Sequence, residues 1–283
     1  MNPDVIVVGD VMMDVSVESG ALAKGGDVHG EVRLLPGGAG ANAAVWAAAE
    51  GARVRLYGRV GNDLPGRLIG EALAERGIEV CLAQDPEVRT GAMLIMRRKG
   101  DRDMVADRGA NARLSADDLP GELRAGAVLV SGYLLFAAGS HDAAVAALRR
   151  ARSPLVAVDA ASWPLLRDFG IERFFDATSD ANVLLANQLE AAMMEGRRRR
   201  LHDGFAMGCV KMGPGGAEMW TPDGFLRARP PSMSTVDATG AGDAFDGVLL
   251  AALAGGAEPA EALQRACDAG ARCADSFELW PAR

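Results

Sequence analysis

Residues 237–245 read Asp-Ala-Thr-Gly-Ala-Gly-Asp-Ala-Phe, so a loop of small residues leads directly into a predicted helix. The helix is indicated by apolar residues that recur at helical spacing: Phe245, Val248, Leu249, Ala252 and Leu253. Because Gly240, Ala241 and Gly242 have little or no side chain, their N–H groups can all point toward one anion at the positive end of the helix dipole. The stretch therefore predicts an anion hole that suits a phosphoryl group in transit.

Asp243 stands at the start of this predicted helix and has two interpretations. Most aspartates in such a position cap the helix by accepting a backbone hydrogen bond. Here the carboxylate also stands beside the predicted anion hole, where a general base must lie to take a proton from an attacking hydroxyl. We therefore favour a general base, with the helix cap as the alternative.

Short apolar runs alternate with helical patterns along the chain, which indicates an α/β fold with a mainly parallel central sheet flanked by helices. The predicted strands cover residues 5–9, 53–60, 128–131, 155–159, 183–186 and 209–212. The predicted helices cover residues 41–50, 65–76, 141–151, 188–195, 243–254 and 259–275. With 283 residues and 49% apolar composition, the chain can form one large α/β domain.

Two segments, about residues 11–36 and 89–108, break this rhythm because both show strand-like alternation without an intervening helix. They are expected to pair as a small sheet beside the main one. Such a sheet could close over a substrate as a lid that excludes water, or it could be a purely structural extension.

Charge and cysteine content limit the class of protein. The net charge of −8 argues against nucleic acid as a partner, because a polyanion would be repelled at long range. The cysteines form no C-x-x-C pair and lie at no zinc-ligand spacing, so they are expected to be buried thiols in a reducing cytosol. No secretory signal is recognisable at the N-terminus, and the longest apolar stretch, near residues 127–138, is shorter than the roughly 20 residues that span a bilayer. We expect a cytoplasmic protein without a membrane segment.

A second small-residue stretch, Pro-Gly-Gly-Ala-Gly-Ala-Asn-Ala-Ala at residues 36–44, opens another predicted helix. Gly37 and Gly38 would let the backbone approach a sugar, and Asn42 offers a donor and an acceptor to vicinal hydroxyls. Residues 38–43 also match the dinucleotide pattern G-x-G-x-x-A, but that fingerprint should directly follow the first strand of a βαβ unit, which here ends well upstream. A helix-opening turn without a ligand is the third interpretation.

Both stretches resemble signatures of the ribokinase-like (PfkB) carbohydrate kinase family. Residues 237–243 are similar to its Asp-Thr-Thr-Gly-Ala-Gly-Asp loop, and residues 36–44 to its Gly-Gly-x-x-x-Asn motif. The resemblance covers nearly the whole chain and implies a ribokinase-like fold with a small β-sheet lid. It assigns Asp243 as the base and the amides of residues 240–242 as the anion hole. Ala238 replaces a common threonine, which matters little if only its backbone is used.

The resemblance also implies substrate contacts. An aspartate at the position of Asp14, in the family's lid hinge, holds substrate hydroxyls, and Asn42 is expected to join it. The lid-end segment that touches the sugar is similar to residues 107–111, which makes Arg108 and Asn111 candidates. Relatives that act on 2-keto-3-deoxygluconate place an arginine near this spot, so Arg108 is a candidate ligand for a substrate carboxylate.

On the nucleotide side, residues 187–190 resemble the family's Asn-x-x-Glu element. This implies that the element organises Mg²⁺ and the phosphates, with Asn187 as a nucleotide-binding residue and Glu190 holding Mg²⁺ through water. The alternative is a helix start capped by Asn187. Residues 211–216 resemble a strand and turn that contact the nucleotide, which makes three of them candidates: Lys211, Gly213 and Gly216. Lys211 stands where threonine is frequent, and it could reach a phosphate or be solvated.

Asp237 matches a family residue that helps to organise the nucleotide loop and a monovalent-cation site. K⁺ is therefore a candidate cofactor beside ATP and Mg²⁺. Residues that complete this cation site usually lie near the C-terminus, but residues 271–280 lack the usual Gly-Ala ending. The sequence thus supports K⁺ less directly than ATP and Mg²⁺.

The resemblance implies an ATP-dependent kinase of a small carbohydrate of the ribose, fructose or 2-keto-3-deoxygluconate type, and also a homodimer through the lid. No G-x-x-x-x-G-K-[ST] motif occurs, so ATP is not expected to bind through a P-loop. A nucleoside kinase of the same fold would differ only in the lid and the acceptor pocket. A non-catalytic sugar-binding paralogue is disfavoured by the intact Asp243. A dinucleotide-dependent oxidoreductase rests on residues 38–43 alone.

Overall fold

The structure, a computed structural model, describes residues 2–19, 24–98, 101–195, 201, 204–231 and 236–282. Within these residues, nine strands form one large sheet in the order β15 (Gly224–Ala228), β14 (Ala217–Thr221), β13 (Met207–Lys211), β12 (Val183–Asn187), β11 (Leu155–Asp159), β9 (Ala127–Ser131), β1 (Val5–Val8), β4 (Val54–Gly61) and β5 (Glu79–Asp85). The strands from β13 to β5 are parallel, and β14 and β15 are added antiparallel. This confirms the predicted mainly parallel sheet.

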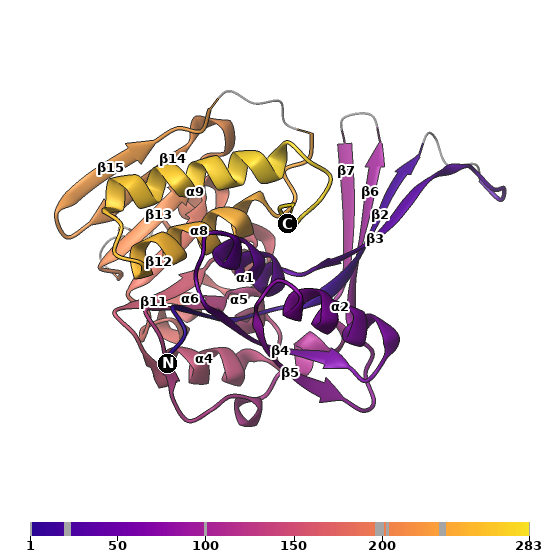
Figure 1. The fold of residues 1–283 in the computed structure, drawn as a ribbon, viewed down its shortest axis with the longest axis horizontal. Coiled ribbons are helices and arrows are strands. Elements are labelled where there is room, and N and C mark those ends of the chain that lie inside the picture. The colour runs from indigo at the N-terminus through magenta and orange to yellow at the C-terminus, as the bar shows by residue number, and fades with distance from the viewer. Residues whose placement is uncertain are drawn as a thin grey trace.

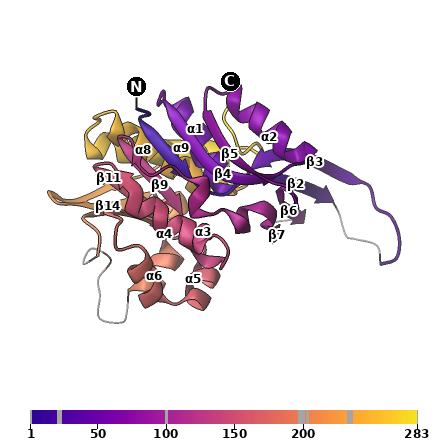
Figure 2. The same ribbon diagram turned by 90° about the horizontal axis from the view of Figure 1, so that it is seen from below.

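Helices cover both faces of the large sheet (Figures 1 and 2). One face carries α1 (Ala39–Ala49), α2 (Leu64–Ala74), α8 (Ala241–Ala254) and α9 (Pro259–Ala274). The other carries α3 (Tyr133–Phe136), α4 (His141–Arg150), α5 (Trp163–Phe169), α6 (Ile171–Ala177) and α7 (Gln188–Met194), and beside it β8 (Leu123–Arg124) pairs with β10 (Ala151–Arg152). In β1, Val5 and Val7 belong to the hydrophobic core under the first set of helices, while Ile6 and Val8 belong to the core under the second set. A strand buried on both faces must be apolar throughout, which is why the parallel strands read as continuous apolar runs.

A separate small sheet has the order β3 (Gly30–Gly37), β2 (Met12–Ser19), β6 (Gly91–Arg98) and β7 (Asp101–Asp107). Strand β2 pairs antiparallel with β3 and parallel with β6, and β6 pairs antiparallel with β7. The four strands come from the two segments in which the sequence predicts an accessory sheet. Figure 1 shows this sheet projecting to the right of the main body.

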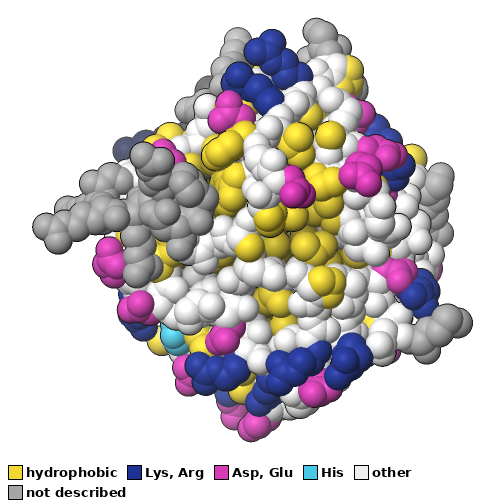
Figure 3. Space-filling model, turned by 90° about the vertical axis from the view of Figure 1, so that its left-hand side faces the viewer, with side chains coloured by type: hydrophobic (Ala, Val, Ile, Leu, Met, Phe, Trp, Pro, Cys, Tyr) yellow, Lys and Arg dark blue, Asp and Glu magenta, His cyan; other side chains and the backbone are white. Residues whose placement is uncertain are grey.

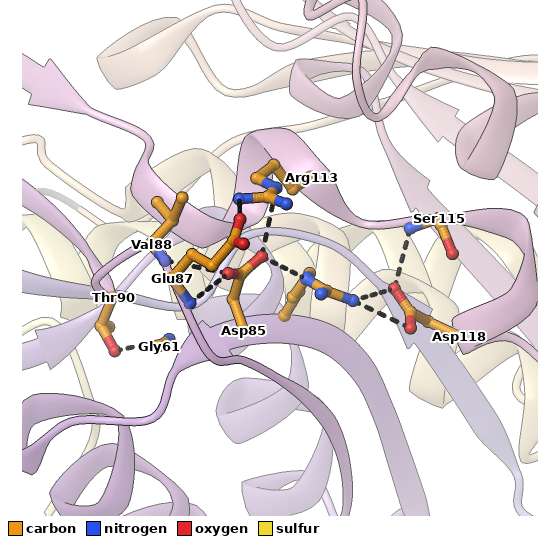
Figure 4. A network of polar contacts seen from close by, with 9 residues as sticks. Gly61, Asp85, Glu87, Val88, Thr90, Arg113, Ser115 and Asp118 are labelled. Atoms are coloured by element: carbon orange, nitrogen blue, oxygen red, sulfur yellow. Dashed lines mark hydrogen bonds and ion pairs between the residues drawn. The ribbon is translucent and has the colours of Figure 1, made fainter.

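A network of ion pairs holds the chain where β5 ends and the connection to β6 begins (Figure 4). Asp85 has a side chain with 0% exposure that accepts the N–H groups of Glu87 and Val88. It also pairs with Arg59 at 3.1 Å and Arg113 at 3.3 Å. Burial opposes its charge, but the two backbone hydrogen bonds and Arg59 outweigh burial and lower the pKa of Asp85 to about 2. These contacts anchor the approach to the small sheet.

The surface drawn in Figure 3 carries mixed charge. Lys and Arg side chains stand in separate groups with Asp and Glu between them, around a centre of apolar side chains. This face therefore presents no field of a single sign. Across the described part of the chain, no helix has the length and apolar character needed to cross a bilayer.

Candidate active site

Helix α8 begins directly after the glycine-containing loop that the sequence singles out. Gly240 adopts a left-handed conformation with φ of 75°, which glycine reaches without the steric penalty of a Cβ. The N–H groups of the first turn point out of the helix without intrahelical acceptors, and one of them, from Ala241, closes the turn by a long bond of 3.3 Å to the Ala238 carbonyl. The junction therefore directs N–H donors and the positive end of a helix dipole toward an incoming anion.

Asp243 lies in the first turn of α8, three residues after the N-cap Gly240, so it is not itself the N-cap residue. Its Oδ2 accepts a hydrogen bond of 2.9 Å from Asn42 Nδ2 on α1. Although the side chain keeps some contact with solvent, desolvation, followed by the nearby Asp159 and Asp10, raises the pKa of Asp243 to about 7, while Asn42 and Lys211 oppose the rise. A carboxyl group with a pKa near neutral pH is suited to accept a proton from an alcohol.

Asp14 on β2 lies close to Asp243 and is 4% exposed. Burial and then the charge of Asp243 raise the pKa of Asp14 to about 7, with Arg97 acting in the opposite direction. Gly37 lies against this carboxyl group, since a Cβ there would stand 2.6 Å from Asp14 Cγ. A glycine at position 37 therefore makes room for the Asp14 carboxylate, which explains part of the Gly-Gly motif.

The next glycines of this motif bring α1 against the end of β1. A Cβ on Gly38, where φ is 94°, would lie 2.5 Å from the Asp10 carbonyl oxygen. A Cβ on Gly40 would lie 2.6 Å from the Gly9 carbonyl carbon. Protein backbone thus fills the space that these glycines leave, and the motif follows β3 of the small sheet rather than β1. This placement removes the structural basis of the dinucleotide interpretation.

The C-terminal segment contacts the side chain of Asn42. Trp280 Nε1 donates a hydrogen bond of 2.9 Å to Asn42 Oδ1, and Trp46 Nε1 donates one of 2.9 Å to the Leu279 carbonyl. Asn42 is 3% exposed and links Trp280 to Asp243 through one buried and one partly buried hydrogen bond. The C-terminal segment, which lacks the usual Gly-Ala ending, therefore contributes Leu279 and Trp280 to the surroundings of Asn42.

On the nucleotide side, Asn187 and Glu190 form a reciprocal cap at the start of α7. Asn187 Oδ1 accepts the N–H of Glu190 at 3.0 Å, and Glu190 Oε2 accepts the N–H of Asn187 at 2.8 Å. This is the cap that we considered as the alternative for Asn187. Glu190 is 2% exposed, and burial together with Asp159 raises its pKa to about 7.

Lys211, the last residue of β13, has a side chain that is 13% exposed and lies in a cluster of ion pairs. Its Nζ donates to Asp159 Oδ2 at 2.8 Å and to Asp246 Oδ1 and Oδ2 at 2.9 and 2.8 Å. The ammonium group therefore already pairs with two carboxylates, one of which it contacts through both oxygens. In the following turn, Gly213 has φ of 54°, and a Cβ on Gly216 would overlap the Ala228 carbonyl.

Asp237 and Arg97 connect the loop before α8 to the small sheet. Arg97 Nε donates to Asp237 Oδ2 at 2.8 Å, Arg97 Nη2 contacts the same oxygen, and Asp237 Oδ1 accepts both the N–H and the hydroxyl of Thr239. Burial opposes the charge of Asp237, but Arg97 and Thr239 together lower its pKa. Both carboxylate oxygens therefore already have protein partners.

Arg108 and Asn111 lie at the lid-end segment, as the sequence indicates. The guanidinium of Arg108 binds both oxygens of Asp10, with Nη2 to Oδ1 at 2.6 Å and Nε to Oδ2 at 3.2 Å, and also donates to the Tyr133 carbonyl. Asn111 accepts the N–H of Val11 and donates to the Val11 carbonyl, and it is 1% exposed. In this arrangement Asn111 fixes the start of β2.

Sequence reasoning did not identify Arg97, Asp159, Asp246 or Trp280 as parts of this region. A signal existed for Asp246, since it lies three residues after Asp243 and hence on the same face of the helix. Another existed for Asp159, which ends a parallel strand at the edge where α/β proteins bind ligands. Arg97 and Trp280 carry no such signal.

Residues 2–278 match the family described as pfkB family carbohydrate kinase. A ribokinase of Arabidopsis thaliana is 27% identical over 96% of this chain and 76% of its own length. The solved adenosine kinase of Sinorhizobium meliloti has a TM-score of 0.88 at 18% identity, covering 99% of this chain and 96% of that one. An E. coli protein solved with ATP and Mg²⁺ has a TM-score of 0.85 at 20% identity, covering 99% and 94%. The chain therefore belongs to the pfkB family of carbohydrate kinases, which are phosphotransferases with an alcohol group as acceptor.

Proposed function

We propose that this kinase transfers the γ-phosphoryl group of ATP to a hydroxyl of a small carbohydrate, with Asp243 as the general base. The observation that carries the proposal is the Asp243 carboxylate, which lies in the first turn of α8 and accepts a hydrogen bond from Asn42. The likeness to an E. coli protein solved with ATP and Mg²⁺ supports the phosphoryl donor.

In the proposed reaction, Asp243 takes the proton of the acceptor hydroxyl while the hydroxyl oxygen forms a bond to the γ-phosphorus. The bond from that phosphorus to the oxygen shared with the β-phosphate breaks, and this oxygen leaves on ADP. The N–H donors of residues 240–242 stabilise charge on the transferred group, and Asp14 orients the substrate hydroxyls. Positioning and charge stabilisation supply most of the acceleration in reactions of this kind.

The residues of the nucleotide side fit Mg²⁺. The buried carboxyl group of Glu190 is a hard oxygen ligand, and Mg²⁺ in nucleotide sites commonly uses one or two carboxylates with waters and phosphates. Glu190 and Asn187 would hold Mg²⁺ through water, and the ion would supply charge neutralisation on the ATP phosphates. Gly213 and Gly216 are proposed to bring the turn after β13 close to the nucleotide.

Asp237 does not fit a bound monovalent cation, because Arg97 already neutralises its carboxylate and Thr239 occupies its second oxygen. We therefore expect no K⁺-specific increase in rate. The measurement compares the rates in KCl and in a tetraalkylammonium chloride at equal ionic strength. Clear activation by KCl alone would restore K⁺ as a cofactor.

The acceptor is to be found by measuring ADP release across ribose, fructose, 2-keto-3-deoxygluconate, tagatose 6-phosphate and nucleosides. The Arg108 guanidinium already binds the Asp10 carboxylate and is therefore not expected to bind a substrate carboxylate. We expect neutral sugars to be phosphorylated faster than 2-keto-3-deoxygluconate, which carries a carboxylate. Faster turnover of nucleosides would favour the nucleoside kinase alternative. The likeness of the fold to that of an adenosine kinase is the reason for including nucleosides. No ADP release with any acceptor would contradict the kinase proposal and favour a sugar-binding paralogue.

We also propose a cytoplasmic location and a homodimer through the small sheet. The cysteines are free thiols, in keeping with a reducing compartment.

The dimer is proposed because the small sheet exposes apolar side chains. Val32 and Leu34 on β3 and Val105 on β7 are 61%, 67% and 62% exposed, and contact with a second copy of the sheet would bury such side chains. The molar mass from light scattering tests the dimer.

A further inference from the structure

The buried cluster of Lys211, Asp159 and Asp246 has no place in the proposed reaction so far. Its side chains are 13%, 15% and 2% exposed, respectively. Burial works against a charged lysine, but the two aspartates outweigh it and raise the pKa of Lys211 well above its usual value. The ammonium group is therefore a permanent positive charge inside the protein.

A contribution to the stability of the fold does not by itself explain why the protein has this cluster of charged side chains. Removing three charged groups from water costs free energy that their mutual attraction only partly offsets, and well-packed apolar residues often serve a fold equally well. The position of the cluster is more informative. It joins the ends of β11 and β13 to α8, and Asp246 lies three residues after Asp243 in that helix.

The ammonium group lies directly behind the loop that precedes Asp243. A Cβ on Gly242 would stand 3.5 Å from Lys211 Nζ. The groups that face Asp243 come from several elements: Asp10, Asp14, Asn42, Tyr133, Asp159, Lys211 and Cys273. Of these groups only Lys211 is positive, and it opposes the effect of the surrounding carboxylates on Asp243.

We propose that Lys211 is a positioning residue for phosphoryl transfer: held by Asp159 and Asp246, it places a fixed positive charge behind Gly242 that stabilises the negative charge of the Asp243 carboxylate and of the transferred phosphoryl group. Both aspartates hold the ammonium group, so Lys211 is assigned a role through its charge and through the orientation of α8 and not through contact with the substrate. The inference rests on the proposed function, because it assigns Lys211 to the reaction in which Asp243 is the base.

The test compares the pH dependence of kcat in the wild type, Lys211→Met and Lys211→Arg. In Lys211→Met, the acidic limb of the profile is expected to move to higher pH by about one unit, because an opposite charge has been removed near the base. On that limb kcat falls about tenfold, and the loss is smaller at pH values above the limb. Lys211→Arg keeps the charge and is expected to keep the limb, and the KM of the acceptor changes little in both variants.

Two further variants make the result decisive. The double variant Lys211→Met/Asp246→Asn removes the cation together with a buried carboxylate, so that Asp246 is not left as an uncompensated charge. Lys24→Met, at an exposed lysine between β2 and β3, is the control and should leave the profile unchanged. Circular dichroism and the Tm report whether each variant folds.

The inference is overturned if a folded neutral variant keeps the wild-type limb or loses activity equally at all pH values. It is also overturned if neither neutral variant folds, because the cluster is then a structural element. Wild-type turnover and the Asp243→Asn variant are measured in the same series. If those two fail, the proposed function falls and this inference with it; if they behave as expected, an unchanged limb in Lys211→Met rejects only the role of Lys211.

Discussion

Asp243→Asn is expected to lower kcat by about 10²–10⁴-fold, because the variant keeps the shape of the side chain but cannot accept the proton of the acceptor hydroxyl. The amide oxygen of the new side chain can still accept the hydrogen bond from Asn42 Nδ2, so the site should keep its geometry and the acceptor KM should change little. In the wild type, kcat/KM should rise with pH through about 7, where Asp243 ionises. Steady-state rates with saturating MgATP between pH 5 and 9 check both expectations.

The same variant is expected to be at least as stable as the wild type at alkaline pH. Folding raises the pKa of Asp243 from 3.8 to about 7, so the folded protein binds more protons than the unfolded chain between these values. The stability that this group contributes is fully present below its unfolded pKa and is lost as the pH rises through its folded pKa. Asparagine avoids this loss, which could amount to on the order of 1–3 kcal/mol at pH 8.

The Tm of the two proteins at pH 5 and pH 8 measures this effect. Asp223→Asn, at an exposed residue of the turn between β14 and β15, is the matched control and should change neither rate nor Tm. A kcat for Asp243→Asn within a few-fold of the wild type would remove Asp243 from the role of base.

The second large effect is expected for Asn42→Ala, which removes the donor to Asp243 and the acceptor for Trp280 Nε1 in one step. Because this hydrogen bond favours the charged form of Asp243, its loss should move the acidic limb of the pH profile up by about one unit. The buried indole N–H and the carboxylate both lose a partner, so the free energy of unfolding should fall by about 2–4 kcal/mol. Rates across pH and denaturant unfolding at fixed pH separate the two effects.

Trp280→Phe separates the contributions of the two hydrogen bonds. It removes the Nε1 donor and part of a buried ring but keeps the hydrogen bond from Asn42 to Asp243, so it should cost about 1–3 kcal/mol of stability and leave the limb near its wild-type position. Asn42→Asp keeps an acceptor for Trp280 but places a second carboxylate against Asp243, and it should move the limb further than alanine does. An unchanged limb in Asn42→Ala would show that Asn42 does not control the charge of Asp243.

Local sequence patterns were sufficient for most of the fold. The apolar runs of the parallel strands, the helical spacing after residue 242 and the uninterrupted alternation in two segments each follow from the burial of a single element. They correctly predict the mainly parallel large sheet and the separate small sheet. Strand β5 was missed because it lies at the edge of the sheet and its sequence, Glu-Val-Cys-Leu-Ala-Gln-Asp, is not a continuous apolar run. Helices α5 and α6 were also missed.

The same patterns left the individual side chains of the site undecided. For Asp243, the sequence left cap and base open, and it gave no sign that Asn42, 201 residues away, donates a hydrogen bond to this carboxylate. For Lys211, the sequence left a phosphate contact and solvation open, and it gave no sign of the ion pairs with Asp159 and Asp246. For Asp237, the resemblance indicated a monovalent cation, whereas Arg97 from the small sheet occupies that carboxylate.

The sequence by itself determined that a small-residue loop opens a helix with Asp243 in its first turn, and that this helix belongs to a doubly covered α/β sheet. Both are properties of neighbouring residues, whose conformational preferences and apolar spacing act locally. Only the tertiary structure decided what Asp243, Lys211 and Asp237 bind, because their partners arrive from other strands and helices. The strand order and the packing of α1 against α8 bring those partners together, and no local preference encodes either.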